Sequence, residues 1–272
     1  MFETERDALA WYESQPQVIT KKFIDSIPWK EVQEHPINPE FFPVLIYMRD
    51  VESYTEIWYR DMLRTPTGRD PYIRRFMDRW GVEEMQHGSL INRFLEEAGV
   101  PTSEHWVAEA RAKVPFSYSF TDTINSYIAN LFGQHFSGAH MVWGAINEMT
   151  TLQAYRQLWR AAGHPVLERV LRAIAHEESS HAHFYWSIAR IRLERSRFTR
   201  ELAKFVINRF WNPVGEGTKP RNEVNATIGK LFGGDDGITF FDRNVTQRVA
   251  KLPGFSNLTH TTKRIAQASA SL

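Results

Sequence analysis

The sequence contains no cysteine, and this absence excludes several kinds of site at once. Disulfide bonds, thiolate zinc sites and thiol catalysis all require that residue. A chain without disulfides fits a reducing compartment. Its first residues, Met1 to Asp7, also lack the basic-then-apolar order of a signal peptide. We therefore expect a cytoplasmic protein.

Long apolar runs and strong charge imbalance are also missing. No run of about 18 apolar residues occurs, so no transmembrane helix is expected. The 33 basic and 32 acidic side chains give a formal net charge of +1, which does not indicate a nucleic-acid partner. The rest of the composition, 42% hydrophobic with 18 Phe and 9 Trp, is typical of a folded globular chain.

Strands are not predicted either, because no segment alternates convincingly between apolar and polar residues. Apolar residues instead recur at helical spacing, so the predicted fold class is all-α. The 272 residues are expected to form one domain, with a ligand-bearing four-helix bundle at about residues 38–195. Additional helices are predicted at the N-terminus and in a C-terminal extension at about residues 197–272. The first long helix should begin at Asn38-Pro39 and run to about Leu63.

Two E-x-x-H motifs lie where predicted helices should face the core. They are Glu84-Met-Gln-His87 and Glu178-Ser-Ser-His181. Residues i and i+3 of a helix lie side by side, so each motif can present a carboxylate and an imidazole to one metal ion. The alternative is a buried Glu–His hydrogen bond on each helix, which would have to occur twice in matching register. Apolar residues at helical spacing flank both motifs: Phe76, Trp80, Ile91 and Phe94 around the first, and Leu171, Ile174, Tyr185 and Ile188 around the second.

A glutamate precedes each motif by about one helical hairpin. Glu148 lies 30 residues before Glu178, and Glu52 lies 32 residues before Glu84. The order helix-Glu, helix-ExxH therefore occurs twice, as antiparallel helix pairs of one bundle require. Close to Glu52, Asp50 and Glu56 are alternative ligands on the first helix. If it is not a ligand, Glu56 is either a spare surface charge or a supporting group beside the ligands.

These features predict a centre for two metal ions. Four carboxylates carry four negative charges, which two divalent cations neutralise. Mixed carboxylate and imidazole ligands are typical of iron or manganese rather than zinc or copper. Iron and manganese are therefore both candidates for the two ions, and no motif indicates an organic cofactor. The predicted ligands are Glu52, Glu84, His87, Glu148, Glu178 and His181.

Other features have both a structural and a functional interpretation. Met149, Leu152 and Tyr155 on the third ligand helix are either ordinary core residues or the lining of an acyl-chain pocket. Two arginine clusters are either solvated surface charge or a dock for an acidic partner protein. The clusters are Arg64, Arg69, Arg74, Arg75 and Arg79, and Arg190, Arg192, Arg195, Arg197 and Arg200.

Three segments resemble those of the soluble acyl-carrier-protein desaturases, a family in the ferritin-like di-iron carboxylate superfamily. Residues 80–95, WGVEEMQHGSLINRFL, are similar to that family's W-x-x-E-E-x-x-H-G-x-L-x-N-x-x-L segment. Residues 175–181, AHEESSH, resemble its A-D-E-x-R-H segment, and residues 147–151, NEMTT, resemble its Q-E-R-A-T segment. The resemblance extends from about residue 40 to near the C-terminus.

This resemblance implies a ferritin-like bundle and a di-iron, O2-dependent desaturase that forms a cis double bond in a fatty acyl chain. It also implies acyl carrier protein or another acyl carrier as partner, a ferredoxin-type electron donor and a homodimer. Thr151 matches a threonine on the oxygen-binding side and is the implied catalytic residue. Trp80 matches a tryptophan assigned to electron transfer, and Glu177 occupies a supporting position next to a ligand.

The chain departs from the family pattern at several positions. Glu177 replaces an aspartate, Ser180 replaces an arginine, and Tyr155 stands where some members have histidine. The segment around Glu52 does not align cleanly. These departures bear on substrate and partner more than on the metal centre. The alternative functions are a ferritin-like oxygenase acting on an amine or another lipid, a ferroxidase or iron-storage protein, and a metal-free helical interaction protein.

Overall fold

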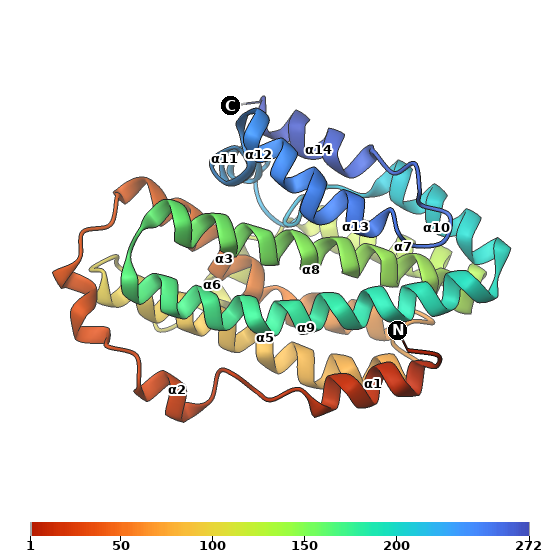
Figure 1. Cartoon of the computed structure of the whole chain (residues 1–272), viewed down its shortest axis with the longest axis horizontal. Coiled ribbons are helices and arrows are strands. Elements are labelled where there is room, and N and C mark those ends of the chain that lie inside the picture. The colour runs from red at the N-terminus through yellow and green to blue at the C-terminus, as the bar shows by residue number, and fades with distance from the viewer. Residues whose placement is uncertain (1, 272) are drawn as a thin grey trace.

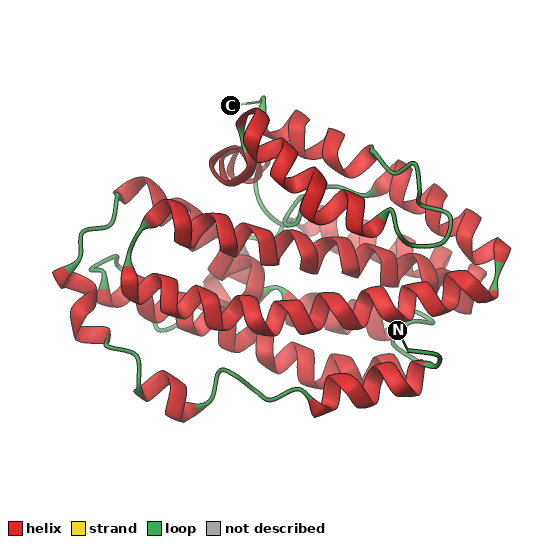
Figure 2. Ribbon diagram, in the orientation of Figure 1, coloured by secondary structure: helices red, strands yellow, loops and turns green. Residues whose placement is uncertain are grey.

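The computed structural model describes residues 2–271 and, for residues 119–125, the backbone alone. Helices make up the secondary structure of this part of the chain, and it contains no β-strand (Figure 2). The prediction of an all-α fold is therefore confirmed. Across the same residues, no helix combines the length and apolarity needed to cross a membrane.

Four long helices form the bundle at the centre of the molecule (Figure 1). The helix α3 (Phe42–Ser53) packs against α5 (Pro71–Glu97), and α8 (Gln134–Ala162) packs against α9 (Pro165–Arg195). Contacts between α5 and α9 join the two pairs. The bundle thus brings together the four segments on which the sequence places the candidate ligands.

Local sequence signals fix the ends of these helices. The Asp70 carboxylate accepts hydrogen bonds from the backbone N–H groups of Tyr72 and Ile73, which caps α5. Between α8 and α9 the chain turns at Gly163, whose φ of 62° is the left-handed conformation that favours glycine. Pro165 then occupies the first position of α9, where a missing N–H is tolerated.

The predicted helix from Asn38 to Leu63 is interrupted in the structure. It consists of the short 3-10 helix η2 (Pro39–Phe41), then α3, then α4 (Thr55–Leu63). At the break, Arg111 donates a hydrogen bond of 2.8 Å to the backbone carbonyl of Ser53, and the Ser53 hydroxyl bonds to the carbonyl of Asp50. These bonds compete with the helical pattern, so residues before and after Tyr54 no longer share one helix face.

Peripheral helices surround the bundle. The helix α1 packs along α5 and α9, and the C-terminal helices cover α8 (Figure 1). Their bounds are α1 (Glu5–Ser14), α2 (Lys21–Asp25), η1 (Trp29–Glu34), α6 (Trp106–Ala112), α7 (Phe116–Phe132), α10 (Arg197–Phe210), α11 (Arg221–Phe232), α12 (Gly234–Phe241), η3 (Asp242–Thr246), α13 (Gln247–Val249) and α14 (His260–Ser269).

Candidate metal centre

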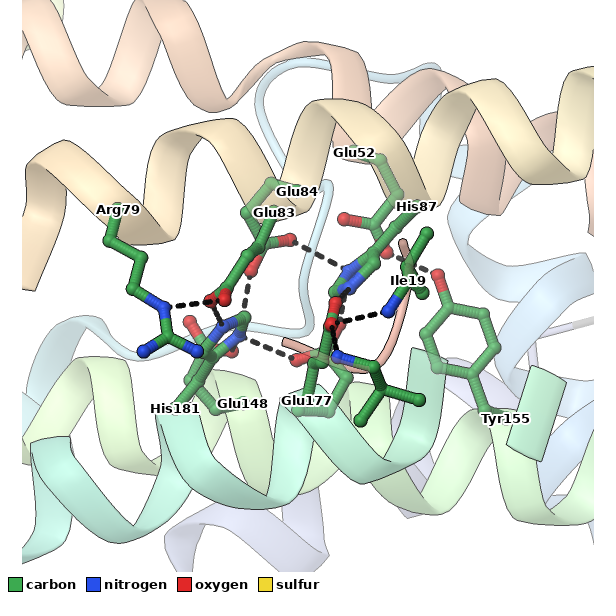
Figure 3. A network of polar contacts seen from close by, with 12 residues as sticks. Ile19, Glu52, Arg79, Glu83, Glu84, His87, Glu148, Tyr155, Glu177 and His181 are labelled. Carbon is green, nitrogen blue, oxygen red and sulfur yellow. Dashed lines mark hydrogen bonds and ion pairs between the residues drawn. The ribbon is translucent and has the colours of Figure 1, made fainter. Parts of the chain in front are cut away.

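The candidate ligands from all four bundle helices meet in the core (Figure 3). They form two groups in which every residue offers a ligand atom within 4.8 Å of the others. Glu84 and Glu178 belong to both groups, and all six side chains are buried. The first group is Glu52, Glu84, His87 and Glu178, and the second is Glu84, Glu148, Glu178 and His181.

Glycines allow the helix backbones to approach closely beside this cluster. A Cβ atom on Gly88 of α5 would lie only 3.2 Å from the Cβ of Glu52 on α3. On the other helix pair, a Cβ on Gly144 of α8 would lie 2.3 Å from the ring of Tyr185 on α9. Small residues at these two positions therefore let each glutamate-bearing helix reach its E-x-x-H partner.

Both histidines direct Nδ1 toward the carboxylates of the cluster. His87 Nδ1 lies 3.3 Å from Glu178 Oε1, and His181 Nδ1 lies 3.0 Å from Glu84 Oε1. Their Nε2 atoms face outward, His87 to Glu177 Oε2 at 3.0 Å and His181 to Glu83 Oε2 at 2.8 Å. A carboxylate can only accept a bond from the ring, so Nε2 carries hydrogen and, in the neutral ring, Nδ1 keeps its lone pair for a metal.

The outer carboxylates are arranged crosswise. Glu83 precedes ligand Glu84 but binds the histidine of the α9 motif, and Glu177 precedes ligand Glu178 but binds the histidine of the α5 motif. Each E-E-x-x-H segment therefore supplies ligands of its own and orients the histidine of the other. This exchange couples α5 and α9 at the centre of the bundle.

The N-terminal segment holds both outer carboxylates in place. The hydroxyl of Tyr12 donates to Glu83 Oε2 at 2.7 Å, and Arg79 Nε donates to Glu83 Oε1 at 2.7 Å. Glu177 Oε1 instead accepts the backbone N–H groups of Val18 and Ile19, at 2.8 Å and 2.9 Å. Residues 12–19 thus span both halves of the centre from outside the four bundle helices.

These contacts shift the acidities of the outer carboxylates. Burial opposes ionisation of Glu83, but hydrogen bonds from His181, Tyr12 and Arg79 outweigh it and lower the pKa to about 2. Burial also opposes ionisation of Glu177, yet bonds from His87 and from the backbone of Ile19 lower its pKa. Both outer groups are therefore anions that accept hydrogen bonds from the histidines.

The pKa values of the inner residues of the cluster reflect the negative charge that is enclosed there. Burial raises the pKa of Glu52 and Glu148 well above the ordinary value, and repulsion from Glu84 and Glu178 adds to the shift. Burial opposes the charged form of both histidines, but hydrogen bonds to carboxylates, with coulombic attraction, hold the pKa of His87 and His181 above its usual range. Protons balance the negative charge here, and two divalent cations would balance it in their place.

Atoms that make no hydrogen bond provide a direct test of whether the residues fit metal ions. Among the described residues, five buried atoms of the cluster make no hydrogen bond, although His181 Nδ1 and Glu84 Oε1 lie 3.0 Å apart. Buried polar atoms without partners are costly unless an ion or water satisfies them. Oxygen and imidazole donors also suit iron and manganese. The donor set and its charge therefore fit two divalent ions; the five atoms are Glu84 Oε1, Glu178 Oε1 and Oε2, His87 Nδ1 and His181 Nδ1.

The structure distinguishes the three acids considered on the first helix. Glu52 lies in the cluster, 3% exposed. Asp50 is buried elsewhere and pairs with Lys219 at 2.9 Å and with Arg49. The Glu56 side chain is 68% exposed and pairs with Arg111, because the break at Tyr54 turns it away. Glu56 thus takes no part in the cluster, and of the two alternatives to a ligand role it is a surface charge rather than a supporting group.

The proposed pocket residues separate into two environments. The hydroxyl of Tyr155 donates a hydrogen bond to the carboxylate of Glu52, so this ring contacts a candidate ligand (Figure 3). Met149 and Leu152 instead line a cavity of about 590 Å³ beside α9, together with Trp11 and Trp186. Tyr155 is not among the residues that line it.

The two residues assigned by resemblance lie one turn from a ligand. Thr151 follows Glu148 on α8 and is half-buried. Trp80 precedes Glu84 on α5 and is buried, with its ring 6.3 Å from the rings of both Phe76 and Tyr185. Both positions are close to the cluster along the helix, and the roles of these two residues stay predictions.

Sequence reasoning missed Glu83, Arg79 as its partner, and the contribution of residues 12–19. A signal for Glu83 was available, because the pair Glu-Glu begins both E-E-x-x-H segments and Glu177 had already been selected in one of them. The backbone groups of Val18 and Ile19 carry no residue-specific signal. Tyr12 had none either, since its contact with Glu83 spans 71 residues.

Part of each arginine cluster is structural. Arg192 forms buried ion pairs with Glu5 at 3.0 Å and Asp70 at 2.5 Å, and Arg79 binds Glu83. Arg69 and Arg197 are exposed. The clusters therefore contain fewer free cations than the sequence suggests.

Comparison with known families matches residues 53–206 to the family described as fatty acid desaturase. The matched segment covers more than half of the 272 residues. It begins one residue after Glu52 and contains the other candidate ligands, together with Glu83, Glu177 and Thr151. No curated protein matches the chain.

Proposed function

The chain belongs to the fatty acid desaturase family, and on this premise we propose that it is a di-iron, O2-dependent desaturase with a ferritin-like bundle. The reaction forms a cis double bond in a fatty acyl chain held on acyl carrier protein, with electrons from a ferredoxin-type donor. We further propose that the whole chain is one domain, with the ligands carried by residues 38–195.

One observation carries this proposal: the two ligand groups share Glu84 and Glu178. Each group then adds one carboxylate and one imidazole of its own, Glu52 with His87 and Glu148 with His181. Shared carboxylates are the arrangement expected when two ions lie side by side in a bundle core. The four negative charges match two divalent cations, which supports a pair of ions over a single one.

Bound iron would supply the oxygen activation that removal of hydrogen from an unactivated C–H bond requires. The residues of the chain provide the rest. Glu83 and Glu177 keep the two histidines oriented, and Tyr155 orients Glu52 through its hydroxyl. Buried aromatic residues such as Phe76 and Tyr185 keep water from the cluster. We assign to Thr151 the positioning of oxygen or a proton beside Glu148.

Iron content and product formation test this proposal together. The protein loaded with iron should hold about two ions per chain, as the two ligand groups require. Acyl carrier protein with a saturated acyl chain, reduced ferredoxin and O2 should then yield an unsaturated product by gas chromatography. Glu148→Gln should abolish the product, whereas the matched control Glu56→Gln should retain it, because Glu56 lies outside the cluster.

Other outcomes would assign the chain differently. Iron at this stoichiometry without unsaturated product would keep the metal centre and reject desaturation on this carrier, and a screen of amines and other lipids would then follow. Uptake of many irons by a large cage would indicate iron storage. Failure to bind metal would contradict the metal centre itself, on which the proposed reaction depends.

A further inference from the structure

At one end of the bundle, α7 leads into α8 and α9 leads into α10 (Figure 1). Large apolar side chains are exposed in this region. The rings of Phe132 and Phe198 lie 6.4 Å apart, so the end of α7 and the start of α10 are neighbours. We call this region the end surface. Its members, with their exposed fractions, are Tyr127 73%, Ile128 46%, Leu131 84%, Phe132 37%, Phe198 52% and Phe205 60%.

Helical periodicity places the exposed apolar side chains of each helix on one face, and the contact between Phe132 and Phe198 joins the two faces. On α7, Tyr127 and Leu131 are four residues apart, as are Ile128 and Phe132. On α10, Thr199, Ala203 and Ile207 face the protein and are buried. Phe198, Leu202 and Phe205 recur at intervals of four and three on another side of the helix. The helix α10 therefore has an inner apolar face and an outer one.

The end surface is large for a protein in water. At roughly 200 Å² for a fully exposed aromatic side chain, its four aromatic residues alone expose about 450 Å². The largest apolar patch of a typical monomer is about 300–600 Å² and often has a function. Ile128 and Leu131 add to the area. An exposed apolar area of this size indicates a binding surface.

Arginines border the end surface on both sides. Arg69 donates a hydrogen bond to the side chain of Asn130 on α7, and the same amide donates to the carbonyl of Arg64. Arg197 starts α10 next to Phe198. Among the described residues, nearby acids are paired: Glu194 with Arg190, Glu201 with Lys204, and Asp61 with Arg64. The exposed Arg69 and Arg197 therefore give this part of the border a positive charge.

We propose that the end surface docks on an anionic phospholipid bilayer. Aromatic and aliphatic side chains would enter the boundary between headgroups and acyl chains, and the bordering arginines would contact lipid phosphates. A second copy of the chain fits less well. In a symmetric dimer the same patch faces itself, which brings the positively charged borders of both copies together. Charge thus favours a lipid partner over self-association.

Vesicle co-sedimentation of the full chain tests this proposal. Binding should be strong to vesicles in which about a third of the phosphatidylcholine is replaced by phosphatidylglycerol, weak to phosphatidylcholine alone, and should fall as salt rises. Leu131→Gln should weaken binding roughly tenfold, because it removes an apolar contact. Arg197→Gln should weaken it roughly fivefold, the effect of one cation at the membrane surface.

Matched controls place the effect on this surface. Val82→Gln changes an apolar residue that is 54% exposed on α5, and Arg172→Gln changes an arginine whose side chain is 60% exposed on α9. Both should bind anionic vesicles like the unchanged chain. All variants should keep the thermal midpoint of unfolding, since the altered side chains are largely in solvent.

Two results would overturn the proposal. One is absence of vesicle binding, including the case in which sedimentation shows a dimer that Leu131→Gln dissociates, since the partner would then be a second copy. The other is vesicle binding that the end-surface variants do not weaken more than the controls. Neither result depends on metal content or on desaturation, so the test stands apart from that of the proposed function.

Discussion

The two halves of the candidate metal centre have the same kinds of candidate ligand but different support. His87 is oriented by Glu177, which is held by two backbone N–H groups of residues 18 and 19. His181 is oriented by Glu83, which is held by the side chains of Tyr12 and Arg79. The inner glutamates differ too, because Glu52 accepts a hydrogen bond from Tyr155.

The duplicated sequence pattern determines the candidate ligands and the outer carboxylates, but it does not determine which groups hold those carboxylates in place. The candidate ligands and outer carboxylates recur in both halves, as the proposed pair of ions and the two histidines would require. Partners of the outer carboxylates need only donate hydrogen bonds, so a tyrosine, an arginine or a backbone amide can fill this role. The N-terminal segment supplies both kinds, which makes it part of the centre although it carries no ligand.

The largest expected effect is on the number of bound ions, and it should differ between carboxylates that belong to both ligand groups and those that belong to one. Glu178→Gln removes a charged donor from both ligand groups, so we expect less than about one ion per chain. Glu148→Gln affects one group, and the other should still bind about one ion. Metal analysis after gel filtration measures both, with Glu56→Gln as the control. Equal loss of metal in the two glutamine variants would contradict a pair of sites with shared ligands.

Next in size are the outer carboxylates. Glu83→Gln and Glu177→Gln should each weaken metal binding about 10–100-fold, because the histidine loses an anionic acceptor that fixes its orientation and raises its basicity. Competition with a chelator measures the change. Tyr12→Phe should produce a smaller loss confined to the His181 half, since Arg79 still holds Glu83. A loss of affinity in Tyr12→Phe as large as that in Glu83→Gln would show that the tyrosine is needed to hold Glu83 in place.

Much of this centre follows from the sequence, and the rest has an identifiable reason. Helical spacing placed Glu84, His87, Glu178 and His181 on core-facing stripes, where the structure has them. The position of Glu56 could not be predicted, because the break at Tyr54 depends on Arg111, 58 residues beyond Ser53. The bond from Val18 to Glu177 spans 159 residues and uses a backbone amide, which every residue except proline has.

The α7–α10 region shows that helical periodicity also does not predict which apolar residues are exposed at the surface. Phe132 ends α7, a helix whose apolar residues recur at helical spacing. In the structure it is 37% exposed and borders the end surface. Periodicity identifies an apolar face but does not identify what covers it.

The helix pairs should differ in their tolerance of a methyl group. Gly144→Ala would place Cβ 2.3 Å from the Tyr185 ring, whereas the nearest side-chain or backbone atoms to a Cβ on Gly88 lie at 3.1–3.3 Å. We expect Gly144→Ala to lower the free energy of unfolding by about 1–3 kcal/mol through overpacking, and Gly88→Ala to lower it less. Denaturant unfolding of the metal-free proteins measures both. A larger effect at Gly88 would mean that α3 and α5 yield less readily than α8 and α9.

The smallest effect should come from Tyr155, which contacts one half of the centre alone. Tyr155→Phe keeps the buried ring but removes the hydroxyl that donates to Glu52, and a single hydrogen bond contributes about 0.5–1.5 kcal/mol net of its exchange with water. Because Glu52 belongs to the His87 group only, the weaker-binding ion should be the one in that group, while the group of Glu148 and His181 keeps its affinity. Stepwise titration with metal resolves the two ions.

Double substitution with Glu52→Gln is the control, since Tyr155→Phe should add almost nothing once its acceptor is uncharged. An equal loss of affinity for both ions would mean that Tyr155 acts through the shared carboxylates instead. The two halves would then be coupled through α8 as well as through the crossed histidine contacts.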